Sequence, residues 1–139
     1  MIESDIRMIE SSLNMLLPEY YRRTMLDYPF PANSFANEFL LPNDPEPIID
    51  YNQGSGEHPG IGKLFIIGSD GGEELYFVDL TADNSCVFTF DMETGKHTTK
   101  ASDWMEYLRQ VENELKEIKE NEKPERERKA NKKWWEFGK

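Results

Sequence analysis

Residues 63–80, KLFIIGSDGGEELYFVDL, decide the fold of this chain. They open with a continuous apolar run bounded by glycines, which is typical of a strand covered on both faces. A glycine-rich turn follows over residues 68–72, and residues 73–80 then alternate, with Phe77 on one face and Tyr76 on the other. The stretch therefore predicts two antiparallel strands joined by a turn.

Two further strands are expected directly downstream. Residues 86–91 alternate between Cys, Phe and Phe on one face and Val, Thr and Asp on the other, and residues 96–99 return as a fourth strand. The loop between them, residues 92–95, ends in Gly95, which supplies the positive φ that a hairpin turn requires. Strands joined in this order form an antiparallel meander over residues 63–99.

Two helices are expected before the sheet. Apolar residues at alternating spacings of four and three predict an amphipathic first helix, and Pro18 opens a second helix that Pro29 and Pro31 end. The stripe of the first helix is Ile2, Ile6, Ile9, Leu13 and Leu16, and that of the second is Leu17, Tyr21, Thr24 and Tyr28.

A last helix is expected after the sheet, over residues 102–120, with Ser102 and Asp103 as its cap. Its stripe is Trp104, Leu108, Val111, Leu115 and Ile118. Helices and strands together predict a core made of Ile6, Ile9, Leu13, Leu64, Ile66, Phe77, Phe88, Trp104, Leu108 and Val111.

The segment between the second helix and the sheet has a weaker pattern. Residues 38–41, EFLL, could form a short strand stopped by Pro42, and residues 48–52 could form a brief helical or extended piece between loops. Residues 53–60, QGSGEHPG, are predicted to be a loop because glycine and proline are frequent there.

This order of elements predicts an α+β fold: an antiparallel meander sheet flanked by an N-terminal helical pair and a C-terminal helix. The 139 residues fit one domain, which we expect over residues 1–120. Residues 121–139 are expected to be a charged tail, helical or extended, that ends in Trp134, Trp135 and Phe137. Three large aromatics this close together need a partner surface, so they are candidate residues for self-association, including a homodimer.

Composition and charge exclude several classes of protein. The formal net charge is −11 at pH 7, with −14 over residues 1–115 and +3 over residues 116–139. This balance argues against nucleic-acid binding, which requires Lys and Arg to neutralise phosphates. No apolar stretch is long enough to span a membrane and no signal peptide is recognisable, so we expect a cytoplasmic protein.

The single cysteine, Cys86, excludes an intramolecular disulfide, and with two histidines it makes no structural zinc site. Cys86 heads an apolar strand and is expected to be a buried small hydrophobe, because no basic neighbourhood activates its thiol. His58 and His97 have no companion ligands nearby in the sequence and are interpreted as ordinary polar residues. We therefore expect no catalytic residue, metal or cofactor.

The densest acidic group comprises Asp70, Glu73, Glu74, Asp79 and Asp83. Its spacing does not match an EF-hand, and no nucleophile–base pair accompanies it, so neither calcium binding nor enzyme activity is expected. The glycine-rich turn within it precedes a strand, whereas a phosphate-binding loop precedes a helix. Two interpretations stay open: a solvated acidic rim, or a face that binds a cationic partner.

Three blocks of the chain resemble the SUKH superfamily of Smi/Knr-like domains. The first is LPEYY at residues 17–21, after the N-terminal helix, and the second is the apolar strand, glycine-rich turn and strand of residues 65–80. The third is the start of the last helix, residues 102–108. The resemblance covers residues 4–118, but residues 28–33, YPFPAN, stand where family members often carry an Asn-Gly-Gly turn.

The resemblance implies an α+β domain without enzymatic activity. Many bacterial members are encoded with polymorphic toxins and look like immunity proteins, whereas fungal relatives regulate cell-wall synthesis and act as scaffolds. It predicts a non-catalytic protein-binding module that neutralises a cognate basic toxin, for example a nuclease, with the acidic group as its binding face. Two alternatives stay open: a regulatory or scaffold protein of the same fold, and a small-molecule-binding or hydrolytic domain.

Overall fold

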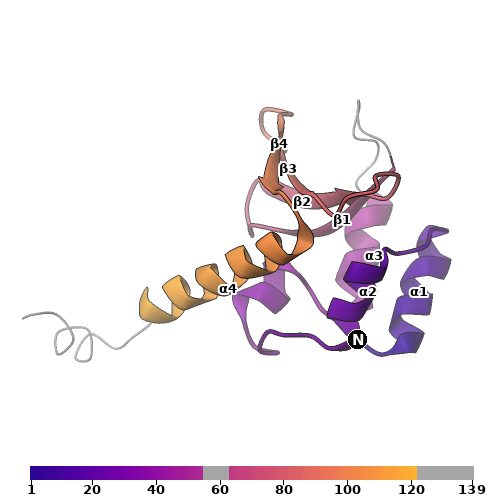
Figure 1. Ribbon diagram of the computed structural model, residues 1–139, viewed down its shortest axis with the longest axis horizontal. Helices are drawn as coiled ribbons and strands as arrows, with labels where there is room; N and C mark the ends of the chain where they lie inside the picture. Colours follow the sequence, from indigo (N-terminus) through magenta and orange to yellow (C-terminus); the bar gives the residue numbers. More distant parts are fainter. Residues whose placement is uncertain (55–62, 122–139) are drawn as a thin grey trace, which may run out of the picture.

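Four strands form one antiparallel sheet (Figure 1). The computed structural model describes residues 1–54 and 63–121. Each strand pairs with its neighbour in the sequence, in the order β1-β2-β3-β4, which confirms the predicted meander. The strands are β1 (Leu64–Ser69), β2 (Glu74–Asp79), β3 (Val87–Asp91) and β4 (His97–Ala101).

Helices precede and follow the sheet, as the predicted α+β class requires. The second half of the last helix projects away from the sheet (Figure 1). The Asp103 carboxylate caps this helix, because its Oδ1 accepts the Glu106 N–H at 2.8 Å. The helices are α1 (Glu3–Leu13), α2 (Glu19–Leu26), the π-helical turn η1 (Ala36–Leu40), α3 (Pro45–Gly54) and α4 (Trp104–Asn121).

The first turn of the meander is shorter than expected. Gly68 and Ser69 continue β1 beyond a bulge that follows Ile66, so they do not belong to the turn. The Asp70 carboxylate then accepts the backbone N–H of Gly72 at 2.7 Å and that of Glu74 at 3.1 Å. These bonds fold the chain back into β2, because an aspartate side chain can replace the backbone partners of a turn.

The stripe of the first helix is wrong at both ends, because Ile2 precedes α1 and is exposed, and Leu16 follows it. Ile6 and Ile9 are buried, but α1 ends at Leu13 because Asn14 adopts the left-handed conformation, with φ 52°. Leu16 is therefore 81% exposed instead of continuing the buried stripe. The chain turns into α2 through a bond in which the Glu10 carboxylate accepts the Leu17 N–H at 2.9 Å.

The expected strand at residues 38–41 is wrong, because this part of the chain forms η1. The Leu41 N–H donates to the Ala36 carbonyl at 2.7 Å, which closes a π-type turn. Hydroxyls of Tyr107 and Tyr28 donate to the Leu40 and Leu41 carbonyls, each at 2.6 Å. The two carbonyls thus bond to distant tyrosines instead of a neighbouring strand.

The segment after Pro45 is helical, which decides between the helical and extended alternatives. The loop expected over residues 53–60 is wrong at its start, since α3 continues through Gly54, and its remainder lies outside the described residues. Asn52 of α3 lies beside β1 and pairs with it like another strand. Its amide accepts the Ile66 N–H at 2.8 Å and donates to the Ile66 carbonyl at 3.0 Å.

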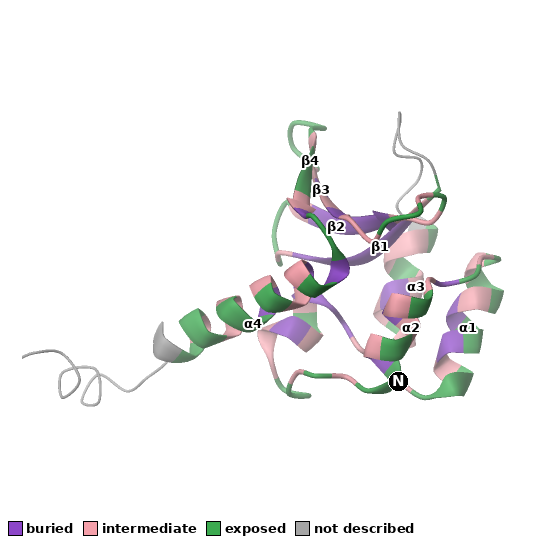
Figure 2. Ribbon diagram, viewed as in Figure 1, coloured by how far each residue is buried: buried purple, intermediate pink, exposed green. Residues whose placement is uncertain are grey.

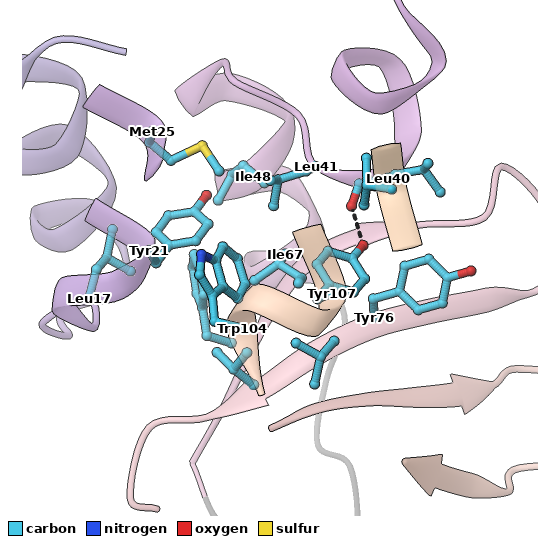
Figure 3. Close-up of a cluster of buried hydrophobic side chains, with 14 of the residues drawn as sticks. Leu17, Tyr21, Met25, Leu40, Leu41, Ile48, Ile67, Tyr76, Trp104 and Tyr107 are labelled. Atoms are coloured by element: carbon cyan, nitrogen blue, oxygen red, sulfur yellow. Dashed lines mark hydrogen bonds between the residues drawn. The ribbon is translucent and has the colours of Figure 1, made fainter. Parts of the chain in front are cut away.

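The main core lies between the helices and one face of the sheet (Figures 2 and 3). Tyr76 and Val78 of β2 face it, while Phe77 packs on the opposite face with Ile66 and Leu75. Of the ten predicted core residues, Ile6, Ile9, Ile66, Phe77, Trp104 and Val111 are buried, and Leu13, Leu64, Phe88 and Leu108 are half-buried. The apolar stripe predicted for α4 did not include Tyr107, which is only 1% exposed and belongs to the core.

Cys86 is not the buried residue that the sequence predicts. It is half-buried and precedes β3, which begins at Val87. Its thiol donates to the Ser102 carbonyl at 3.1 Å, so it joins the start of β3 to the residues before α4.

Candidate functional site

Four carboxylates gather at one end of the sheet. The β1–β2 turn brings Asp70 and Glu73 there, and the β3–β4 hairpin brings Asp91 and Glu93. The hairpin is fastened to the turn because the Met92 N–H donates to the Glu73 carbonyl at 2.9 Å. The ligand atoms of Glu73, Asp91 and Glu93 all lie within 4.8 Å of one another. We call Asp70, Glu73, Asp91 and Glu93 the sheet-end cluster.

Two members of the sheet-end cluster hold the local backbone. Asp70 closes the β1–β2 turn, and the Asp91 carboxylate accepts the N–H of Glu93 at 2.8 Å and that of Thr94 at 3.3 Å. The exposed Glu73 and Glu93 have no such structural bonds. The cluster therefore combines two turn-forming aspartates with two glutamates available to an incoming partner.

The cluster repels its own charges. The pKa of Glu73 is raised above its ordinary value of 4.5, first because its protonated carboxyl can donate a hydrogen bond to Glu93, whereas the ionised form cannot. Loss of water and the charges of Asp91 and Asp70 raise this pKa further. A cationic group placed here would relieve that repulsion.

The five predicted partner-binding residues do not form one group. Asp70 and Glu73 belong to the sheet-end cluster, and Glu74 begins β2 beside it. Asp79 lies at the other end of β2, about 17 Å away along the strand. There the burial of Tyr20 raises the pKa of its hydroxyl to about 12, and the nearby charge of Asp79 is the second cause of this shift. Asp83 lies in the β2–β3 loop, on the Asp79 side of the sheet.

Among the described residues, no second group of three or more Asp, Glu, His or Cys side chains lies as close together as Glu73, Asp91 and Glu93 do. Every ion pair within residues 1–54 and 63–121 joins helical residues, so no described cation forms an ion pair with the sheet-end cluster. Its three closest carboxylates could approach one cation, but Asp91 already accepts two backbone N–H groups. Exposed carboxylates alone do not define a metal site.

A groove of about 720 Å³ lies beside the end of α4. One wall is formed by Leu115, Ile118 and Lys119 of α4, and the other by residues 31–38. The Asn37 amide in that second wall is already occupied, since it donates to the Ala32 carbonyl at 2.7 Å and accepts the Asn43 N–H at 2.7 Å. The groove therefore offers apolar contact together with two charged side chains, Glu38 and Lys119.

The described cysteine and histidine, Cys86 and His97, each contact groups other than one another. Within residues 1–54 and 63–121, the Cys86 thiol bonds to a backbone carbonyl. His97 packs against aromatic rings, with centroids 5.2 Å from Phe90 and 6.4 Å from Phe77. His58 and the aromatic residues Trp134, Trp135 and Phe137 lie outside the described residues, as does the expected tail apart from Asn121, which ends α4.

Comparisons with known proteins do not identify a relative of this chain. No family model, curated protein or solved structure matches the chain. Among the described residues, no helix has both the length and the apolar composition needed to cross a membrane.

Proposed function

We propose that this chain is a protein-binding module of the SUKH type that acts as an immunity protein. It binds a basic bacterial toxin in the cytoplasm and blocks the toxin's active cleft without catalysing a reaction. The observation that carries this proposal is the sheet-end cluster, whose four carboxylates have no described cationic partner. The resemblance of three blocks of sequence to the SUKH superfamily supports the same function.

Charge would guide the two proteins together. The chain carries a formal net charge of −11, which attracts a basic cleft over several ångströms before contact. At contact, Glu73 and Glu93 would meet Lys or Arg side chains and replace the phosphates of a nuclease substrate. The fixed positions of Asp70 and Asp91 hold the turns that present these two glutamates.

The test is to co-purify the chain with the product of the neighbouring gene and to measure association rates. We expect Glu73→Lys/Glu93→Lys to slow association about tenfold at low salt, the scale of electrostatic steering. This loss should shrink as salt rises, because salt screens exposed charges. The rate of dissociation should change less.

The matched control is Asp50→Lys/Asp83→Lys, which changes net charge equally at exposed positions outside the sheet-end cluster. Equal slowing by both double variants would contradict a specific face. Circular dichroism of each variant verifies the fold before the comparison. Absence of any complex with the neighbouring gene product would overturn the immunity function itself.

A further inference from the structure

The groove beside α4 has the properties of a peptide-docking surface. Leu115 and Ile118, three residues apart, lie on the same side of α4, and both are half-buried. Phe35 lines the facing wall and packs against Phe39, with ring centroids 5.1 Å apart. The volume of about 720 Å³ falls within the range of roughly 300–1,000 Å³ that holds a drug-sized ligand.

The segment that follows α4 has the matching composition. Residues 122–139 contain seven Lys or Arg and four Glu, and they include Trp134, Trp135 and Phe137. Large aromatic side chains are the usual anchors that fill a pocket in a protein interface. Their net charge of +3 also complements the −14 of residues 1–121, and Glu38 adds a carboxylate to the groove itself.

The chain between α4 and Trp134 is long enough for the aromatic residues to reach the groove of the same molecule. Lys119 lines the groove two residues before α4 ends at Asn121. Trp134 is the thirteenth residue after Asn121, and an extended chain of thirteen residues reaches up to about 43 Å. A short tether also gives an effective concentration in the millimolar range, far above that of a second copy at micromolar protein.

We propose that Trp134, Trp135 and Phe137 bind in the groove between residues 31–38 and the end of α4 of their own chain. The aromatic side chains contact Leu115, Ile118 and Phe35, and the basic residues before them lie over the acidic surface of the same molecule. This interaction does not depend on the proposed toxin-binding role.

The test compares hydrogen exchange in the full chain and in Trp134→Ala/Trp135→Ala/Phe137→Ala. We expect amides of residues 31–38 to exchange at least about fivefold faster in the triple variant. The docked aromatic residues would suppress local opening of this wall, and the triple variant cannot dock. The β3–β4 hairpin, residues 92–95, should be unchanged. Glu136→Ala, within the same segment, is the matched control and should retain the slow exchange.

A second variant changes the groove and leaves the aromatic residues intact. Ile118→Lys should accelerate exchange of residues 31–38 as the triple variant does, and should make more tryptophan fluorescence accessible to acrylamide. Trp104, which is 4% exposed, gives a constant protected signal in both proteins. The triple variant leaves the described core untouched, so it tests the proposal even if Ile118→Lys unfolds.

Sedimentation velocity identifies which chain supplies the aromatic residues. A monomer whose residues 31–38 stay protected upon dilution supports binding within one chain. Protection that disappears upon dilution together with a dimer would overturn the proposal in favour of a second copy. Equal exchange in the full chain and the triple variant would overturn docking in the groove altogether.

Discussion

Gly68 lies where the backbone of η1 meets β1. A Cβ at this position would lie 2.3 Å from the Leu40 carbonyl oxygen and 2.6 Å from that of Phe39. We expect Gly68→Ala to reduce the free energy of unfolding by about 3 kcal/mol, because backbone cannot move aside as a flexible side chain can. Urea denaturation measures this loss. Gly72→Ala is the control, since its Cβ would have only ordinary contacts, and an equal loss there would contradict the steric explanation.

The raised pKa of Glu73 makes stability depend on pH. A carboxyl whose pKa is raised by folding stabilises the folded state below its ordinary pKa of 4.5, and this stabilisation is lost as pH rises through the folded-state pKa. Glu73→Gln removes the repulsion, so its melting temperature should exceed that of the unchanged chain at pH 7. The difference should vanish below pH 4.5. A difference independent of pH would show that charge is not its cause.

At the scale of the element, η1 depends on a hydroxyl from α4. The Tyr107 hydroxyl donates to the buried Leu40 carbonyl at 2.6 Å (Figure 3). The Tyr21 hydroxyl, in contrast, is buried without a hydrogen-bond partner among the described residues. We expect Tyr107→Phe to cost about 1–3 kcal/mol, because it leaves a buried acceptor unsatisfied. Tyr21→Phe should be neutral or stabilising. Thermal unfolding compares the two, and equal losses would contradict this account of η1.

The same element shows where sequence patterns stop being informative. The meander was predictable because alternation and glycine positions are local properties of residues 63–99. The turn η1 was not, because its carbonyl partners Tyr28 and Tyr107 are 13 and 67 residues away in the chain. Residues 38–41 carry a strand-like apolar run, and only tertiary contacts convert it into a helical turn.

Part of the candidate site could be predicted from the sequence. A meander places its first and third turns at one end of the sheet, so Asp91 and Glu93 could have been grouped with Asp70 and Glu73 instead of Asp79. The interaction between Glu73 and Glu93 could not be predicted, because it depends on the hydrogen bond that joins the β3–β4 hairpin to the β1–β2 turn. The groove also required the structure, since residues 31–38 and α4 are far apart in the chain.

At the scale of the whole molecule, negative charge opposes compactness. The net charge of −11 causes self-repulsion, which salt screens as the Debye length falls from about 30 Å at ~10 mM to about 8 Å at ~150 mM. We expect the melting temperature at pH 7 to rise by a few degrees over that range. Near the isoelectric point of about 4.6 the rise should disappear. Calorimetry at both pH values checks this, and an equal response at both would contradict it.

The amide of Asn52 limits how large an aggregate this sheet can build. It occupies both backbone groups of Ile66 on the outer side of β1, while β4 pairs only with β3 among the described residues. A sheet with two free edges can recruit further copies without end, as in a fibril. With β1 blocked, a molecule that joined another through β4 would have no second edge to offer. Growth through this sheet would then end at a pair, which is a closed assembly.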